Sequence, residues 1–238
     1  MKTVLITGGT GGIGQALVKG YAKEGWRTAF GYHRKKEEAE RLARETSSLC
    51  FQADLRDEKS LLVFFQSAMQ QLGHLDALIV CAGTSWQGLI TDMPTCSYDE
   101  LMALNLRSAF LLSKQALLLM SKQHCGSILF ISSIQGLQGA SCEAAYAASK
   151  AGLIGLARSL ACEYGPSGIR VNCLTPGAID TGMMSVFSPE DKETLRTSTP
   201  LQRLGRADDI RDAALFLTSE KASFITGQVL GVDGGLVL

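Results

Sequence analysis

The sequence predicts an α/β fold, in which one doubly wound parallel sheet of about seven strands carries helices on both faces. Three observations predict it. The chain has 238 residues and 46% hydrophobic content, enough to bury a substantial core within one domain. Short apolar runs alternate with longer segments of helical period, the pattern of a parallel sheet covered on both sides. A glycine-rich segment directly follows the first run, where such sheets often bind a ligand.

The predicted strands are seven short runs rich in Val, Ile, Leu and aromatic residues. They span residues 3–7, 27–32, 49–53, 76–81, 127–132, 169–175 and 228–232. Parallel strands need long crossover connections, and the segments between these runs are long enough to provide them.

The predicted helices are the segments of helical period between the strands. They span residues 12–24, 35–46, 57–72, 97–122, 143–164 and 207–218. Asp57 and Ser97 are good N-cap residues, and we expect them to open their helices. Ligands of such sheets bind beyond the carboxyl ends of the strands, so the residues just after each strand are the candidates for function.

Charge and cysteine content exclude several classes of protein. Lys plus Arg and Asp plus Glu both number 23, so no net charge steers the chain toward nucleic acid or an anionic membrane. The first apolar run is too short for a signal peptide or a membrane span. Seven scattered cysteines without a C-x-x-C pair favour reduced thiols and a cytoplasmic location. The three histidines do not cluster at ligand spacing, so we expect no metal site.

The segment TGGTGGIG at residues 7–14 predicts a phosphate-binding turn. Gly8, Gly12 and Gly14 follow the first strand, and a helix begins at the last glycines. A helix N-terminus reached through glycines offers backbone N–H groups and a positive dipole end to a pyrophosphate, the arrangement of a Rossmann-type fold. The alternative is a tight strand-to-helix turn that binds nothing. No Lys-Ser/Thr follows, so the segment is not a P-loop.

The end of the second strand indicates which dinucleotide would bind. A free adenosine ribose usually meets an Asp or Glu here, but the chain has His33, Arg34, Lys35 and Lys36. An available guanidinium favours a ribose 2′-phosphate, so we expect NADP rather than NAD. Alternatively, residues 34–36 only form the solvated start of a helix. Asp54, after the third strand, is expected to border the adenine.

Hydroxyl groups gather after the fifth predicted strand. That strand ends at Ser132 and Ser133, and Tyr146 and Lys150 follow one helical turn apart on the next helix. These side chains can therefore face one cleft at the carboxyl edge of the sheet. Alone, the Tyr146 and Lys150 pair is an ordinary helix-surface pattern.

These segments together resemble the short-chain dehydrogenase/reductase family over essentially the whole chain. The resemblance is carried by TGGTGGIG (7–14), ADL (53–55), CAG (81–83), NLRSAF (105–110), ISS (131–133), YAASK (146–150), IRVNCLTPGAIDT (169–181) and ITGQVLGVDGG (225–235). It implies a single domain over residues 1–238, with a cofactor half at about 1–125 and a catalytic and substrate half at about 126–238.

The resemblance implies a catalytic tetrad of Asn105, Ser133, Tyr146 and Lys150. Tyr146 would give its proton to a carbonyl oxygen that Ser133 holds by a hydrogen bond, as hydride reaches the carbon. Lys150 would bind the nicotinamide ribose and, with the oxidised nicotinamide, favour the phenolate of a residue whose pKa is ordinarily near 10. Asn105 would hold a water that links Lys150 to solvent.

The resemblance also implies the contacts of the cofactor. Its expected neighbours are Thr7, Gly8, Thr10, Gly12, Ile13, Gly14, His33, Arg34, Asp54, Leu55, Cys81, Ala82, Gly83, Tyr146, Lys150, Pro176, Gly177, Ile179 and Thr181. Two positions depart from the family. Cys81 stands where an Asn usually braces the cofactor loop, so we expect that brace to be lost and the thiol to be a buried filler rather than a nucleophile. Gly11 stands where many NADP-dependent relatives have a basic residue.

Two substrates are implied, both with a carbonyl on a protein-borne arm. The chain most resembles 3-oxoacyl-acyl-carrier-protein reductases of fatty-acid synthesis, although only Lys122 and His124 offer positive charge near the cleft for an acidic carrier protein. Residues 139–143 and 180–192 resemble bacterial reductases of a 5-aminopentanone group on elongation factor P. Expected substrate contacts are Ser133, Gln135, Met183, Met184 and Phe187. We expect the last three, together with Val186, to form either an apolar lid or a helix packed on the core.

The assembly state and a non-catalytic alternative complete the expectations. Runs such as AFLLSKQALLLM (109–120) are apolar on more than one face, and the family commonly forms tetramers, so we expect a homotetramer, with a dimer as the second choice. A different class of function would be a non-catalytic NADP-binding sensor or scaffold. We expect neither a nucleic acid nor a membrane as a partner.

Overall fold

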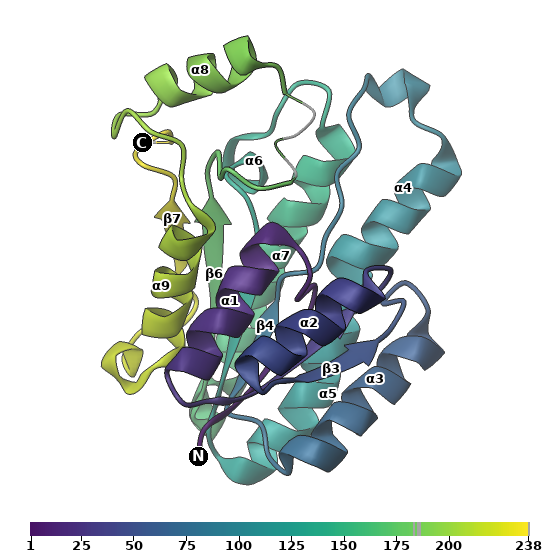
Figure 1. The fold of residues 1–238 in the computed structure, drawn as a ribbon, viewed down its shortest axis with the longest axis vertical. Coiled ribbons are helices and arrows are strands. Elements are labelled where there is room, and N and C mark those ends of the chain that lie inside the picture. Colours follow the sequence, from purple (N-terminus) through teal and green to yellow (C-terminus); the bar gives the residue numbers. More distant parts are fainter. Residues whose placement is uncertain (183, 185–186, 238) are drawn as a thin grey trace.

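The computed structural model describes residues 1–182, 184 and 187–237 and contains one seven-stranded parallel sheet (Figure 1). The strand order β3-β2-β1-β4-β5-β6-β7 confirms the predicted fold class. The strands are β1 (Thr3–Ile6), β2 (Arg27–Tyr32), β3 (Leu49–Gln52), β4 (Ala77–Val80), β5 (Gly126–Ile131), β6 (Ile169–Pro176) and β7 (Val229–Val232).

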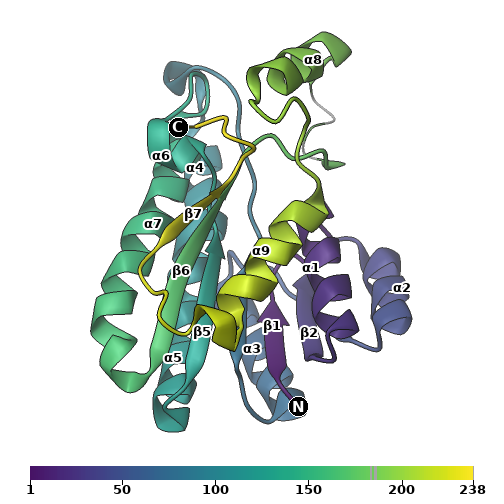
Figure 2. The ribbon, with the colours of Figure 1, turned by 90° about the vertical axis from the view of Figure 1, so that its left-hand side faces the viewer.

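Helices cover both faces of this sheet. They are α1 (Gly12–Lys23), α2 (Lys36–Thr46), α3 (Glu58–Leu72), α4 (Thr95–Met102), α5 (Ser108–Gln123), α6 (Gln135–Gln138), α7 (Ala144–Tyr164), α8 (Pro189–Ser198) and α9 (Ala207–Thr218). Figure 2 shows α1 and α9 on one side of the sheet and α5 and α7 on the other. Within the described residues, no helix is both long and apolar enough to cross a membrane.

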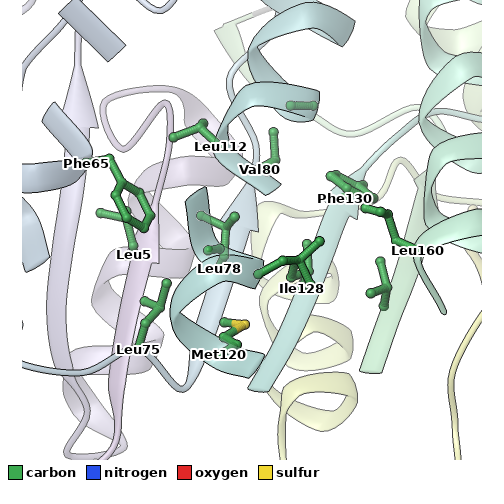
Figure 3. Close-up of a cluster of buried hydrophobic side chains, with 14 of the residues drawn as sticks. Leu5, Phe65, Leu75, Leu78, Val80, Leu112, Met120, Ile128, Phe130 and Leu160 are labelled. Carbon is green, nitrogen blue, oxygen red and sulfur yellow. The ribbon is translucent and has the colours of Figure 1, made fainter. Parts of the chain in front are cut away.

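Two apolar layers join the helices to the sheet because successive strand side chains point to opposite faces. In β1, Leu5 packs in the cluster that includes α3, α5 and α7, whereas Val4 and Ile6 pack in the cluster that includes α1, α2 and α9. In β5, Ile128 and Phe130 join the first cluster (Figure 3). β1 and β4 are buried on both faces and are therefore continuous apolar runs rather than alternating ones, whereas the edge strands β3 and β7 are only partly buried.

The order of the strands places the topological switch point of the sheet between β1 and β4. β1 pairs with β2 on one side and with β4 on the other, so the direction in which the chain crosses the sheet reverses there. Ile6 and Ile79 are register partners, and the segments that follow them leave the sheet side by side. The glycine loop and residues 81–83 are those segments, at the position where doubly wound sheets bind ligands.

The helix predicted at 97–122 differs from the structure. A π-helical turn at Ala103–Arg107 divides it into α4 and α5. The N-cap of α4 is Pro94, so Ser97 does not open this helix as predicted. Asp57, in contrast, caps α3 by accepting a hydrogen bond from the Ser60 amide at 2.8 Å.

Two helices were not predicted, α6 and α8. α6 follows β5 and is one turn long. α8 lies beyond the carboxyl ends of the strands (Figure 1), where it begins with a capping box between Ser188 and Asp191 and with Pro189 in its first turn. None of its residues is buried.

Candidate active site

The glycine loop forms the start of α1. The Gly11 amide donates to the Gly8 carbonyl at 2.9 Å, which closes the turn, and no side chain caps the helix. The first N–H groups of α1 are therefore available to an anion. A Cβ on Gly12 would lie 2.6 Å from Cβ of Thr181, so the segment after β6 lies directly against this helix start. These two segments fit the diphosphate of a dinucleotide.

Thr7 holds the glycine loop against the end of β4. Its buried hydroxyl oxygen accepts hydrogen bonds from the amides of Cys81 and Ala82, both at 3.0 Å. Gly8 has a φ of +69°, and a Cβ there would lie 2.9 Å from Cα of Ala82. The two loops are therefore braced by Thr7, although Cys81 lacks the side-chain amide that braces them in relatives.

Arg34 is the free cation at the adenosine end of the predicted cofactor site. Lys35 and Lys36 form ion pairs with Glu38 and Glu40 of α2, whereas the guanidinium of Arg34 forms no hydrogen bond or ion pair with any described residue. An exposed, unpaired guanidinium suits a ribose 2′-phosphate.

Asp54 lies between the Arg56 guanidinium and the His33 imidazole at the same end of the site. The Arg56 guanidinium donates to it at 2.7 Å and lowers its pKa to about 2, and His33 lies 3.6 Å away. The side chain of Leu55 is buried in the core under α3, so any contact with a nucleotide would come through its backbone.

Ser133, Tyr146 and Lys150 lie together beyond β5. Ser133 is two residues past the strand, whereas Tyr146 and Lys150 come from the first two turns of α7. The Ser133 hydroxyl lies close enough to Tyr146 to lower the pKa of its phenol, and Nζ of Lys150 lies 5.5 Å from the centre of the Tyr146 ring. That Nζ also donates to the Ile131 carbonyl at 2.9 Å, which fixes the lysine against the end of the strand. All three side chains are buried.

Asn105 occupies the π-helical turn and holds the loop after β4. Its Oδ1 accepts from the Thr84 amide at 2.9 Å, while its Nδ2 donates to the Thr84 carbonyl and to Oγ of Ser149. A Cβ on Gly83 would lie 3.3 Å from both Oδ1 of Asn105 and Nζ of Lys150, so this glycine separates them. The structure thus brings all four predicted tetrad residues to one place. A water held by Asn105 stays a prediction.

The pKa of Tyr146 is shifted opposite to the expected direction. Burial raises it to about 12, a hydrogen bond with Ser133 lowers it, and the charges of Glu143 and Cys81 raise it. Burial also lowers the pKa of Lys150 to about 8. Low polarity disfavours the charged form of each group, so in the protein alone the phenol is held protonated rather than ionised.

Cys81 has the properties of an inert thiol. Burial raises its pKa to about 11, and the nearby Lys150 lowers it only in part. The thiolate is the reactive form of cysteine, so this environment fits the predicted filler rather than a nucleophile.

A short chain of hydrogen bonds leads away from Ser133. Its Oγ donates to Oε1 of Gln135 at 2.8 Å, and Nε2 of Gln135 donates to Oε2 of Glu143 at 2.5 Å. Gln135 is a predicted substrate contact, whereas no site role was predicted for Glu143. Glu143 lies three residues before Tyr146, at the N-cap of α7.

The remaining predicted contacts lie along the same edge of the sheet. Pro176 ends β6, Gly177 donates its amide to the Val232 carbonyl, and Ile179 is buried beside α9. Thr10 is buried in the glycine loop, and Ile13 is half-buried in the first turn of α1.

The predicted apolar lid is only partly described. Met184 is buried and Phe187 is half-buried, whereas Met183 and Val186 lie outside the described residues. No group of three or more His, Cys, Asp or Glu side chains that could hold a metal occurs in the described part of the chain.

Comparisons with known proteins agree with this arrangement. The family described as enoyl-(acyl carrier protein) reductase matches residues 8–237. The chain is 39% identical to the uncharacterized oxidoreductase YmfI of Bacillus subtilis over 98% of both chains. It is 36% identical to the 3-oxoacyl-[acyl-carrier-protein] reductase FabG of Staphylococcus aureus, over all of this chain and 98% of that one. A solved short-chain type dehydrogenase/reductase from Mycobacterium ulcerans superposes with a TM-score of 0.94 at 29% identity, covering 99% of this chain and 89% of that one.

Proposed function

The chain belongs to the short-chain dehydrogenase/reductase family, and we propose that it is an NADPH-dependent reductase of a ketone on a protein-borne arm. The observation that carries this proposal is the cluster of Ser133, Tyr146 and Lys150 beside the glycine loop. A protonated phenol, a hydroxyl and a buried amine at one sheet edge are what delivery of a proton to a carbonyl oxygen needs.

The chemistry assigns one task to each side chain. The bound dinucleotide supplies a hydride to the carbonyl carbon. Tyr146 Oη donates its proton to the carbonyl oxygen, so that the ketone becomes an alcohol and the phenol becomes a phenolate. Ser133 keeps that oxygen within reach of the phenol. Lys150 stabilises the phenolate by its charge and, with a pKa of about 8, can return a proton to it near neutral pH.

NADPH is the preferred cofactor because of Arg34. The guanidinium can donate two parallel hydrogen bonds to a phosphate, and no described side chain competes for it. With Gly11 at the loop position that is often basic in relatives, Arg34 would be the main contact of the 2′-phosphate. NAD is therefore the weaker alternative.

The first candidate substrate is a 3-oxoacyl thioester on acyl carrier protein. This candidate rests on the relatives named 3-oxoacyl-[acyl-carrier-protein] reductase, with identities of 36% in Staphylococcus aureus and 34% in Thermotoga maritima. The product would be the 3-hydroxyacyl thioester. All seven cysteines are free, which favours the reducing cytoplasm as the place of this reaction.

The second candidate is a 5-aminopentanone group on elongation factor P. The specific observation in its favour is the carboxylate of Glu143, which lies close to Ser133 and has no cationic side-chain partner among the described residues. An acidic carrier protein would be better served by basic side chains at this position. The carboxylate of Glu143 could instead form an ion pair with the amine of an aminopentanone.

A panel of substrates tests both candidates. The purified protein is assayed for oxidation of NADPH, and of NADH, with short 3-oxoacyl thioesters, with 3-oxoacyl carrier protein and with elongation factor P that carries the aminopentanone group. We expect faster turnover with NADPH than with NADH, and the preferred carbonyl identifies the substrate. Tight NADPH binding without reduction of any carbonyl would contradict the proposal and favour a non-catalytic sensor or scaffold.

A further inference from the structure

A half-buried carboxylate lies at the substrate side of the proposed catalytic cluster. Glu143 precedes the first residue of α7, and its side chain does not cap that helix. It is directed instead toward Gln135, the first residue of α6. A Cβ on Gly136 would lie 2.8 Å from the carbonyl carbon of Lys150, so α6 is pressed tightly onto α7. This packing fixes Gln135 between Ser133 and Glu143.

The chemistry of a carboxylate sets the direction of the whole chain of hydrogen bonds. A carboxylate can only accept, so Gln135 must present its NH₂ group to Glu143 and its carbonyl oxygen to Ser133. Ser133 has a single proton, and that proton is donated to Gln135. Glu143 therefore determines where the proton of Ser133 points.

The negative charge of Glu143 is uncompensated within the described part of the protein. No Lys, Arg or His lies within ion-pair distance of it, although the described chain forms many ion pairs elsewhere. Burial raises the pKa of Glu143, and besides burial its charge raises the pKa of Tyr146. An unpaired, half-buried acid is costly, and it opposes ionisation of the phenol unless a ligand brings a cation.

We propose that Glu143 is a specificity-determining residue that binds a positively charged group on the substrate, a short distance from the reacting carbonyl. Two hydrogen bonds and one amide group separate Oγ of Ser133 from the carboxylate, so the two lie at most about 8 Å apart. The substrate class is therefore a ketone that carries an ammonium group on an aliphatic spacer of a few carbon atoms.

A bound ammonium would act on both steps of the reaction. It pairs with the carboxylate and so lowers the Michaelis constant. It also cancels the negative charge that opposes ionisation of Tyr146. In addition, the ammonium can replace Gln135 as the hydrogen-bond donor to Glu143, so that Ser133 is free to donate its proton to the substrate. Discrimination between charged and neutral ketones is thus expected in kcat as well as in KM. This inference rests on the proposed function, because it assumes that a carbonyl is reduced at Ser133 and Tyr146.

Two ketones of the same shape test the inference. One is 5-(dimethylamino)pentan-2-one, a tertiary amine that is protonated at neutral pH and cannot close to a cyclic imine. The other is 6-methylheptan-2-one, in which a CH group replaces the NH⁺ group. The wild-type protein with NADPH should prefer the amine by about 10- to 100-fold in kcat/KM, the range expected of a hydrogen bond to a charged group.

Variants assign that preference to one side chain. In Glu143→Gln the charge is lost at constant shape, and the ratio between the two ketones should fall to near one. Glu163→Gln is the matched control, because Glu163 is an exposed glutamate at the far end of the same helix, and it should keep the wild-type ratio. Retention of the wild-type ratio by Glu143→Gln would overturn the inference.

The measurement on the wild type alone distinguishes a failure of the Glu143 inference from a failure of the proposed function. Equal reduction of both ketones would overturn the role of Glu143 and leave the proposed carbonyl reductase standing. Reduction of neither ketone, together with inactivity on the full substrate panel, would overturn both. The result does not depend on whether a variant folds.

Discussion

Tyr146 and Lys150 lie one helical turn apart, and burial acts on them in opposite directions. It raises the pKa of the phenol to about 12 and lowers that of the ammonium to about 8. The neutral form of each group is thereby favoured. A phenol that stays protonated at neutral pH is ready to donate to a carbonyl oxygen, and an amine that titrates near pH 8 can restore the proton afterwards. The pair is therefore better suited to reduction of a ketone than a pre-formed phenolate would be.

Tyr146→Phe separates binding from proton transfer. We expect unchanged NADPH affinity, because the ring and its packing are kept, and a loss of turnover of about 10²- to 10⁴-fold, the usual contribution of a general acid. Fluorescence titration with NADPH and steady-state kinetics with the best ketone of the panel check the two parts. Turnover equal to that of the wild type would show that another group donates the proton.

Lys150→Met should change how stability depends on pH. The pKa of Lys150 falls from an ordinary 10.5 to about 8 on folding, so between these values the unfolded chain binds more protons than the folded one. Stability contributed by this group therefore rises as the pH increases through that window, and below pH 8 the full penalty of burying the charge applies. Urea unfolding at several pH values should show that the free energy of unfolding of the wild type rises relative to that of Lys150→Met between about pH 8 and 10.5. Parallel curves would contradict this.

At the scale of the elements, strands were easier to predict than the details that shape the site. The strands are short runs rich in apolar residues, so their composition alone locates them to within a residue or two. The π-helical turn at Ala103–Arg107 has no such local signature. It places Asn105 against the Thr84 backbone, a contact between segments distant in the sequence. Such turns often mark functional sites, and here it carries a tetrad residue.

Helix α8 was missed although its signal is present in the sequence. Ser188, Pro189 and Asp191 form a capping box with proline in the first turn, which is a strong start signal. The helix buries no side chain, so it lacks the apolar period on which the sequence prediction relied. Glu143 was missed for another reason. Its contact with Gln135 depends on how α6 packs on α7, which sequence spacing does not reveal.

The N-cap of α3 allows the contribution of one helix end to stability to be measured. Asp57→Ala removes the acceptor of the Ser60 amide and should lower the free energy of unfolding by about 1 kcal/mol. Asp57→Asn is the control, since asparagine caps helices about equally well, and it should remain close to the wild type. Chemical denaturation in the absence of cofactor compares the free energies of unfolding of the three proteins. Equal losses in both variants would assign the effect to charge rather than to the cap.

At the scale of the whole molecule, one sheet joins the two halves of the chain. β4, from the half at about 1–125, pairs with β5, from the half at about 126–238. The cofactor loop and the catalytic cluster are therefore parts of one rigid framework, and we predict a single cooperative domain. The glycines of the loop at 7–14 and Ser133 could be located from the sequence because they follow strands, whereas Asn105, Tyr146 and Lys150 were predicted from the family resemblance. Their mutual distances needed the fold.

Two sets of exposed apolar side chains bear on assembly. Phe110 and Leu118 project from α5, which covers one face of the sheet, whereas Phe224 lies in the segment before the edge strand β7, and further exposed apolar side chains occur in α9 and β7. Phe224 is fully exposed, which is unusual for a side chain that gains from burial. One apolar surface is enough for a two-fold dimer, whereas two different ones permit a tetramer with perpendicular two-fold axes.

We therefore predict a homotetramer that can be divided at either surface. Light scattering coupled to size-exclusion chromatography should give the mass of four subunits for the wild type. It should give the mass of two subunits for Leu118→Asp and for Phe224→Asp. Val63→Asp, a change of an equally exposed apolar residue on α3, is the control and should stay tetrameric. A wild type that elutes as a monomer would contradict the prediction. A wild type with the mass of two subunits, together with a monomer for only one of the two variants, would favour the second choice of a dimer held by a single surface.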